Sequence, residues 1–250
     1  MQTTALFALP EAWVATHRME PGDWRTRWVQ GAAGSFDQWN RMRVVVARNL
    51  LWVIPATPDA SAWLRDKLDA IAGIVAQTVN DAVPLQLRER QVTVRQDPDR
   101  LWAYRMPRFV ADKSQRDWSE QFASPLDASV IDRMTRTIEA SVRRELTAWG
   151  RLPEALSQEH PFLVIADPGR PVVIPAIQGN RSGHGKPVNI LARSGLTLLS
   201  PFRMEGELFA GPLSSLGYGR LLRGSAPEML DRRTQKALLQ LPIREVPSCS

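Results

Sequence analysis

Two pairs of arginines, each with one residue between its members, are the first candidates for chemistry. A guanidinium offers a planar fork of donors that binds a phosphate through two oxygens. In an extended segment, residues i and i+2 point the same way, so each pair could hold one phosphate from two directions. The high pKa of arginine makes it a poor proton shuttle, which assigns these side chains to charge stabilisation and positioning. The catalytic candidates are Arg25 with Arg27, and Arg41 with Arg43.

Tryptophans flank both pairs, namely Trp24, Trp28 and Trp39. Exposed rings at these positions would stack on RNA bases, at about 1–3 kcal/mol for each base. The alternative is that ordinary surface arginines stand beside tryptophans of the core. The spacing alone leaves both interpretations open.

The segment 178–187, QGNRSGHGKP, combines three glycines with basic and titratable side chains. Glycines let backbone N–H groups approach a phosphate, and basic side chains neutralise it. The spacing is not that of a nucleotide-binding P-loop, because Gly179 and Gly185 are one residue too far apart and Pro187 replaces the required Ser or Thr. The segment is expected to contact RNA, with a surface loop that carries an incidental histidine as the alternative. The residues concerned are Arg181, Lys186 and His184, of which the histidine could also act as a general acid or base.

A second glycine-rich segment, 203–224 (RMEGELFAGPLSSLGYGRLLRG), is the most distinctive in the chain. A glycine-rich turn beside basic residues and one aromatic ring suits close contact of the backbone with RNA. A hairpin whose glycines serve a bulge and a tight turn is the alternative. The candidate RNA-binding residues are Arg203, Gly217, Tyr218, Gly219, Arg220 and Arg223.

Residues 129–149 carry the clearest helical pattern. Apolar residues fall on one face at about 100° per residue, namely Ile131, Met134, Ile138, Val142, Leu146 and Trp149. Arginines fall on the opposite side, where they could contact RNA. The alternative is a solvated face in which Glu139 and Glu145 pair with the arginines. The arginines proposed to bind RNA are Arg133, Arg136, Arg143 and Arg144.

These residues must be positioned by a mixed fold, because strand-like and helix-like segments alternate along the chain. The order strand, helix, strand, strand in the first half resembles much of a ferredoxin-like half, and residues 160–224 return to strand-like texture. The predicted elements of the first half are a strand or hairpin over 42–54 bent near Arg48-Asn49, a helix over 60–80, and a hairpin of 88–95 with 101–106. The predicted domains are a ferredoxin-like domain over 1–110, a helical insert over 111–155, and a second ferredoxin-like domain with a glycine-rich loop over 156–250.

The charge balance predicts an anionic partner such as RNA, DNA or an acidic membrane. The 250 residues include 32 Lys and Arg against 26 Asp and Glu, a formal net charge of +6, and only four of the 32 are lysines. A GC-rich genome also replaces lysine by arginine, so the placement of the arginines carries more weight than their number.

Several classes of protein and site are excluded by what the sequence lacks. The single cysteine, Cys249, allows no disulfide framework and no cysteine metal site, and the three histidines are far apart, so no metal and no cofactor are expected. The first residues lack a basic region before a long apolar run, and no stretch is long and apolar enough to span a bilayer. A cytoplasmic protein without a membrane partner is expected.

The motif Gly217-Tyr218-Gly219-Arg220, which follows a strand-like segment and precedes Arg223-Gly224, resembles the C-terminal glycine-rich loop of the RAMP superfamily. These repeat-associated proteins of CRISPR systems build on ferredoxin-like domains, often two in tandem. Within the superfamily the chain is most similar to the endoribonucleases that cut precursor CRISPR RNA beside a repeat hairpin, and its arginine-faced helix suggests the type IV variant. The resemblance implies an α+β fold of two ferredoxin-like (RRM-like) halves with an arginine-rich helical insert.

The resemblance also implies a reaction. Relatives cut RNA without metal: the 2′-hydroxyl attacks the adjacent phosphate and leaves a 2′,3′-cyclic phosphate and a 5′-hydroxyl. Many relatives place an acid–base histidine near the N-terminus, for which His17 is the nearest candidate, although its context ATHRMEPG departs from the pattern. The implied partners are the CRISPR repeat hairpin, the mature crRNA to which the enzyme stays bound, and other subunits of an effector complex.

A non-catalytic RNA-binding subunit of a CRISPR ribonucleoprotein complex is the alternative function. A DNA-binding regulator is less well supported, since no helix-turn-helix pattern is present.

Overall fold

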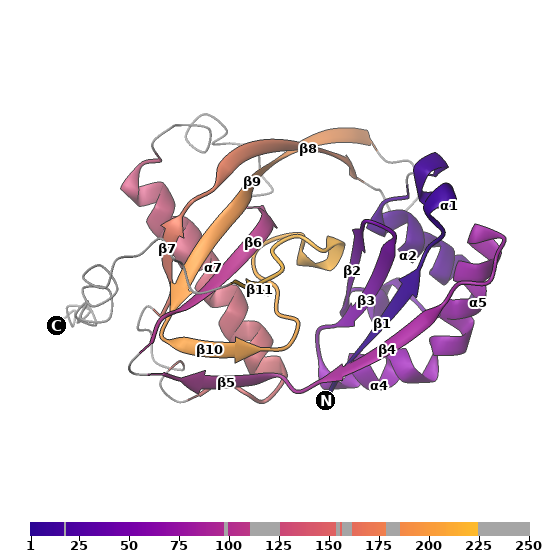
Figure 1. Cartoon of the computed structure of the whole chain (residues 1–250), viewed down its shortest axis with the longest axis horizontal. Coiled ribbons are helices and arrows are strands. Elements are labelled where there is room, and N and C mark those ends of the chain that lie inside the picture. Colours follow the sequence, from indigo (N-terminus) through magenta and orange to yellow (C-terminus); the bar gives the residue numbers. More distant parts are fainter. Residues whose placement is uncertain are drawn as a thin grey trace.

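The computed structural model describes residues 1–17, 19–97, 100–110, 126–153, 156, 162–178 and 186–224, with only the strand backbone over 175–178 and 186–188. Within these ranges the chain forms three antiparallel sheets, of which the two larger are each covered by helices on one face and the third consists of two strands (Figure 1). The prediction of an α+β fold with two ferredoxin-like halves is confirmed.

The first sheet contains four strands in the order β2-β3-β1-β4, with every neighbouring pair antiparallel. This is the order in which strands of a β-α-β-β-α-β unit lie in a ferredoxin-like fold. The helices cover one face of this sheet (Figure 1). The strands are β1 (Gln2–Ala8), β2 (Met42–Ala47), β3 (Leu50–Pro55) and β4 (Leu85–Arg90), and the helices are α1 (Glu11–Thr16), α2 (Pro21–Gln30), α3 (Phe36–Trp39), α4 (Pro58–Asp66) and α5 (Leu68–Val79).

Local signals in the sequence account for this half. The predicted hairpin is confirmed, because β2 and β3 pair across a turn in which Arg48 takes a left-handed conformation at φ 55°. Helical structure predicted over 60–80 is also confirmed, and Leu64, Ile71 and Val75, which recur at helical spacing, are fully buried. The single helix predicted there is in fact two helices, α4 and α5, which meet at Lys67.

The second sheet repeats the strand order of the first. Its order is β11-β6-β9-β7, and β8 extends the sheet by pairing with the first part of β9. The helix α7 connects β6 to β7 and packs its apolar face against this sheet. The elements are β6 (Trp102–Phe109), α7 (Ala128–Ala148), β7 (Val164–Asp167), β8 (Arg170–Gln178), β9 (Lys186–Ser200) and β11 (Leu222–Arg223).

The amphipathic helix predicted over 129–149 is confirmed by α7. Five of the six predicted core residues are buried, and only Ile131 is partly exposed. The helix begins after Asp127, whose side chain accepts a hydrogen bond of 2.7 Å from the backbone N–H of Ser129.

The hairpin predicted between 88–95 and 101–106 is wrong. The strand β5 (Thr93–Gln96) pairs with β10 (Phe202–Glu205), and β6 pairs with β9 and β11. The strand β5 therefore ends at Gln96 and does not fold back onto β6. Because β5 and β10 come from opposite ends of the second half, no local sequence pattern indicates that they pair.

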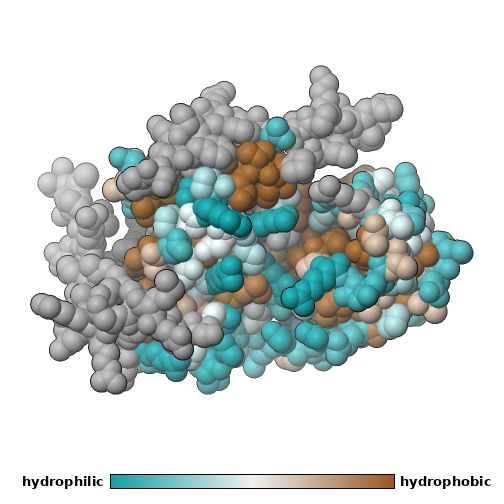
Figure 2. Space-filling model, turned by 45° about the horizontal axis from the view of Figure 1, so that its top comes forward, coloured by the Kyte–Doolittle hydropathy of each residue, from teal (hydrophilic) through white to brown (hydrophobic). Residues whose placement is uncertain are grey.

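The strands β8 and β9 form a long hairpin that arches from the second sheet toward the first half, where α1 and α2 lie (Figure 1). Its residues Val172, Ile174 and Ile190 contribute to a small apolar cluster. Figure 2 shows the molecule rotated so that the top of Figure 1 comes forward. On this face a hydrophobic patch lies beside strongly hydrophilic side chains.

Candidate nucleic-acid interface

A cleft of about 630 Å³ lies between the two halves of the molecule. The open face of the first sheet forms one wall, and β5, β10 and the glycine-rich segment form the other. Its lining residues are Trp52, Arg88, Arg90, Gln91, Thr93, Arg95, Tyr104, Met204, Glu205, Gly206, Glu207, Leu208, Arg220, Leu221, Leu222 and Arg223.

Arginines dominate the charge of this cleft, because five of them face two carboxylates among the lining residues. Glu207 is buried and pairs with Arg220 at 2.8 Å and with Arg90 at 3.7 Å. Glu205 lies 3.6 Å from Arg223. Arg88 and Arg95 form no ion pair with a carboxylate in the described part of the chain. The excess of guanidinium groups makes the cleft suited to a polyanion.

Trp52 places an aromatic ring in the same cleft. The ring is half-buried on β3, with the guanidinium carbon of Arg220 at 4.3 Å from its centre and that of Arg88 at 5.5 Å. Both distances fall in the range of cation–π contact. An aromatic ring between basic side chains is the arrangement on which the bases of single-stranded nucleic acid stack.

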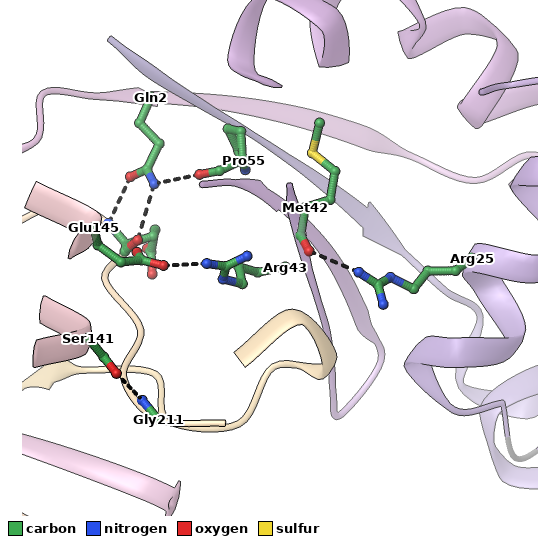
Figure 3. A network of polar contacts seen from close by, with 9 residues as sticks. Gln2, Arg25, Met42, Arg43, Pro55, Ser141, Glu145 and Gly211 are labelled. Atoms are coloured by element: carbon green, nitrogen blue, oxygen red, sulfur yellow. Dashed lines mark hydrogen bonds and ion pairs between the residues drawn. The ribbon is translucent and has the colours of Figure 1, made fainter. Parts of the chain in front are cut away.

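The side chain of Gln2 fixes the wall that carries Glu207. Its Nε2 donates to the backbone oxygens of Pro55 and Glu207, both at 3.1 Å, and its Oε1 accepts from the backbone N–H of Glu207 at 2.8 Å (Figure 3). Since Gln2 is 1% exposed, water does not compete for these bonds. The position of the Arg220 guanidinium thus depends on the first residues of β1.

The structure brings Arg220 and Arg223 into the cleft and places Arg203 beside it. Arg203 pairs with Glu205 at 2.6 Å and lies 5.1 Å from the ring centre of Trp102. These three arginines were proposed from the sequence as RNA-binding residues, and their role stays a prediction.

The lining residues that the sequence reasoning missed include three arginines of the stretch 88–95 and one tryptophan outside it. The stretch 88–95, RERQVTVR, alternates charged and apolar residues as a half-exposed strand does. The spacing of Arg88 and Arg90 shows that one face of the strand is basic there, but not that the other half of the molecule stands opposite it. The missed residues are Trp52, Arg88, Arg90 and Arg95.

The glycines of the motif around Tyr218 pack against the protein itself. Gly217 and Gly219 have φ of 80° and 75°, a region that favours glycine. A Cβ on Gly217 would lie 2.7 Å from the carbonyl oxygen of Val44, and a Cβ on Gly219 would collide with the carbonyl oxygen of Ala210. The small size of both glycines therefore serves close packing of this segment onto its neighbours.

The first predicted arginine pair does not have the geometry expected of it. Arg25 and Arg27 lie on the helix α2, so the expectation that they point the same way from an extended segment is wrong. Arg25 donates to the backbone oxygen of Trp39 at 2.6 Å and to that of Met42 at 3.3 Å, the second of which Figure 3 shows. Arg27 is exposed. Burial, and secondarily the charge of Arg43, lowers the pKa of Arg25 to about 10.

The second predicted pair is also split. Arg43 points from β2 to Glu145 on α7, with 2.5 Å between Nη2 and Oε1 (Figure 3), and Arg41 is exposed before the strand begins. Burial raises the pKa of Glu145, and the charge and hydrogen bond of Arg43 oppose that rise. The structure thus brings Arg25 and Arg43 close to each other but pairs neither with its predicted partner.

The tryptophans beside these pairs belong to the core. Trp24, Trp28 and Trp39 are 0% exposed, and the rings of Trp28 and Trp39 are stacked at 4.3 Å. The expectation that they stack on bases is wrong, and the alternative of core tryptophans is confirmed.

His17 lies at the exposed end of α1. Its ring stacks on that of Trp13 at 4.7 Å, and its Nδ1 lies 3.1 Å from the Trp13 carbonyl oxygen. It does not line the cleft between the two halves. Of the other predicted residues, Arg181 and His184 lie outside the described residues, and Lys186 begins β9 with only its backbone described.

The arginines of α7 divide into two sets. Arg133, Arg136 and Arg144 are exposed, and Arg136 pairs with Asp132 at 3.0 Å. Arg143 instead turns toward the protein, where its Nε donates to the Leu156 oxygen at 2.9 Å. Glu139 and Glu145, which the alternative paired with these arginines, are buried: Glu145 pairs with Arg43, and Glu139 accepts from the backbone N–H groups of Phe162 and Leu163. Contact of the exposed arginines with RNA stays a prediction.

The structure also bears on whether the described residues could form a metal site or a membrane-spanning helix. Over the described ranges, no group of three or more His, Cys, Asp or Glu side chains is placed to hold a metal ion. No helix in that part of the chain is long and apolar enough to cross a bilayer.

Comparison with known proteins places this architecture among solved structures. No family model matches the sequence, and no curated protein matches it either. The structure is similar to Csf5, a CRISPR-Cas type IV Cas6 crRNA endonuclease, with a TM-score of 0.61 and 14% identity over 90% of this chain and 99% of that one. It is also similar to a Cas6b, with a TM-score of 0.55 and 11% identity, and to a CRISPR RNA processing endoribonuclease Cas6b, with a TM-score of 0.53 and 12% identity. Both comparisons cover 90% of this chain and 100% of the other. The chain therefore has the fold of CRISPR RNA-processing endonucleases, as the resemblance of its glycine-rich loop implied.

Proposed function

We propose that this chain is an endoribonuclease that cleaves precursor CRISPR RNA at the repeat hairpin and stays bound to the product. The observation that carries the proposal is the cleft between two ferredoxin-like sheets, in which five arginines and Trp52 face one another. That cleft stands in a fold shared with crRNA endonucleases.

The reaction that fits these side chains is transesterification within the RNA. The 2′-oxygen attacks the neighbouring phosphorus, the bond to the 5′-oxygen breaks, and a 2′,3′-cyclic phosphate and a 5′-hydroxyl result. Guanidinium groups stabilise the charge that develops on the phosphorane oxygens. The proton of the 2′-hydroxyl and the proton that the leaving oxygen needs require other groups.

The test uses the full chain and a CRISPR repeat RNA in the presence of EDTA. We expect cleavage at one position, a cyclic phosphate on the 5′ fragment, and no cleavage when the nucleotide at the cut carries 2′-deoxyribose. A requirement for added metal, or a product with a 5′-phosphate, would contradict the proposed chemistry.

A non-catalytic RNA-binding subunit is the second candidate. It is favoured by the absence of histidine among the described residues that line the cleft. RNA that shifts on a gel but remains intact would support this candidate against the enzyme. Association with other subunits of a CRISPR complex is part of either proposal and is tested by co-purification with the crRNA.

A further inference from the structure

A second hollow, of about 280 Å³, lies where the arching hairpin, β6, the glycine-rich segment and the start of α2 meet. It is separate from the cleft described above, because the two share no lining residue. Its lining residues are Glu20, Arg108, Arg170, Val172, Val173, Ile174, Ser194 and Tyr218.

Two arginines of this hollow are held side by side by the register of the sheet. Ser194 on β9 is the direct partner of Arg108 on β6 and also of Arg170 on β8. Directly opposed residues on neighbouring strands project to the same face with their Cβ atoms about 5 Å apart. The sheet therefore sets two guanidinium groups on either side of one hydroxyl.

Neither of these arginines is neutralised within the described part of the chain. Arg108 and Arg170 are both exposed, and neither forms an ion pair with a described carboxylate. Two like charges across one intervening strand repel each other unless an anion lies between them. A phosphate group, which accepts hydrogen bonds from two forks and a hydroxyl at once, matches the spacing and the charge.

Tyr218 completes the hollow from the opposite side. Its backbone is fixed on one side by Gly217 against β2 and on the other by Gly219, whose N–H donates to the Arg108 carbonyl oxygen at 2.7 Å. Its ring packs with the apolar cluster of the hairpin. Burial, and then the charge of Glu20, raises the pKa of the Tyr218 hydroxyl, which therefore keeps its proton at neutral pH.

We infer that this hollow is the cleavage centre, in which Arg108 and Arg170 bind the scissile phosphate, Glu20 accepts the proton of the 2′-hydroxyl and Tyr218 donates a proton to the leaving 5′-oxygen. The inference rests on the proposed ribonuclease function and assigns its missing acid and base. The step balances: one proton leaves the 2′-oxygen for the carboxylate, the new P–O2′ bond forms as the P–O5′ bond breaks, and the tyrosine proton passes to O5′. Proton transfer through water then restores both side chains.

The cleft lined by Trp52 and five arginines has a different role in this arrangement. It holds the RNA chain, and the hollow performs the cut. Variants of Tyr218 and Glu20 should therefore change the rate of cleavage without changing the affinity for RNA, which a purely structural role in the loop would not predict.

The experiment measures single-turnover cleavage of the repeat RNA by the full chain. Tyr218→Phe is expected to slow cleavage about 100-fold or more with the Kd for RNA within about twofold of the wild type. A substrate with sulfur in place of the leaving 5′-oxygen needs no proton donor, so it should restore the rate of Tyr218→Phe to near that of the wild type. Glu20→Gln should also slow cleavage, but the sulfur substrate should not rescue it, because its defect lies at the 2′-oxygen.

The matched control for the arginines is Arg65→Ala, which removes a half-exposed arginine of α4 that lines neither site. Its rate should equal that of the wild type, whereas Arg108→Ala and Arg170→Ala should both lower it. Wild-type protein that fails to cut repeat RNA would overturn the proposed function itself. If the wild type cuts and Tyr218→Phe cuts equally fast, or is slow with both substrates, only the assignment of the hollow is overturned.

Discussion

Arg43 Nη2 lies 2.5 Å from Glu145 Oε1 and so joins the edge strand of the first sheet to the long helix of the second half. The two side chains are 13% and 7% exposed, which makes this a largely buried ion pair between elements 102 residues apart. A buried pair of this kind is costly to break on one side, because the remaining charge keeps its desolvation penalty. The pair is therefore expected to fix how the two halves meet.

Removal of one partner of this pair should destabilise the protein. We expect Arg43→Ala to lower the free energy of unfolding by about 3–5 kcal/mol, and the double variant Arg43→Met/Glu145→Met to lose less than the sum of the single variants. Urea denaturation of the wild type, Arg43→Met, Glu145→Met and the double variant measures this coupling, with Arg43→Ala measured beside them. Arg136→Ala, which removes an exposed pair, should change stability by less than about 1 kcal/mol. If Arg43→Ala abolishes cleavage at unchanged stability, Arg43 is catalytic, as its sequence context had suggested.

Trp52 should contribute to RNA binding through its ring. We expect Trp52→Leu to weaken binding by about 1–3 kcal/mol, which is roughly 5- to 150-fold, because a base can no longer stack in the cleft. Trp52→Phe should retain much of the affinity, since any aromatic face serves. Fluorescence anisotropy with labelled repeat RNA measures both. Equal affinity of Trp52→Leu and wild type would show that the ring serves only to hold Arg88 and Arg220.

Arg88 and Arg95 should bind phosphates of the RNA. Removal of one arginine that neutralises a phosphate should reduce the slope of log affinity against log salt by about 0.7–0.9, because fewer counterions are released. We therefore expect Arg88→Ala and Arg95→Ala each to flatten the salt dependence, and the double variant to flatten it twice as much. Arg65→Ala should leave the slope unchanged, and a slope in Arg88→Ala equal to that of wild type would place this arginine outside the RNA path.

Gly219 should tolerate no side chain. Its φ of 75° and the approach of the Ala210 carbonyl oxygen mean that Gly219→Ala strains the backbone and displaces the loop that carries Tyr218. We expect a loss of at least about 1–3 kcal/mol in unfolding free energy. Gly22→Ala is the control, because nothing lies within 4 Å of a Cβ there and the position is in a helix, so it should gain up to about 1 kcal/mol. Thermal denaturation compares the two.

Tyr104 should make the fold sensitive to alkaline pH. Burial raises the pKa of its hydroxyl to about 12, and the backbone N–H of Met204, which donates to it at 2.7 Å, opposes that rise. The folded state therefore binds this proton more tightly than the unfolded state does. Its contribution is complete below pH 10 and is lost between pH 10 and pH 12, by up to about 3 kcal/mol. Subtraction of the pH profile of Tyr104→Phe from that of wild type isolates the effect, and parallel profiles would contradict it.

Elements whose pattern is local were predictable from the sequence. The stripe of Leu64, Ile71 and Val75 and the apolar face of α7 follow from spacing alone, since a helix turns every 3.6 residues. The helical position of Arg25 was also readable, because Pro21 followed by Asp23 is a helix start. The arginine pairs were instead interpreted as extended, which led to the wrong orientation.

Relationships across the sheets could not be predicted in the same way. That Ser194 stands between Arg108 and Arg170 depends on the register of three strands, and that register is set by packing far from these residues. Likewise, nothing in the sequence around Trp52 indicates that the guanidinium of Arg220 lies over its ring. Both candidate sites are assembled by such pairings. The sequence therefore identified arginines and a tyrosine as candidates, but not which residues lie beside them in the fold.

The pairing of β5 with β10 sets the order in which the chain can fold during synthesis. Thr93 and Glu205, which share a hydrogen bond of 3.1 Å, are 112 residues apart. At about 5–20 residues per second, a ribosome exposes β5 for roughly 6–20 s before its partner exists, whereas all four strands of the first sheet are already complete. During that interval β5 is an open edge that other nascent chains could extend, and a charged edge strand resists such pairing. We therefore expect the charge of Arg95, which lines the cleft in the folded protein, to disfavour such pairing while the chain is being made.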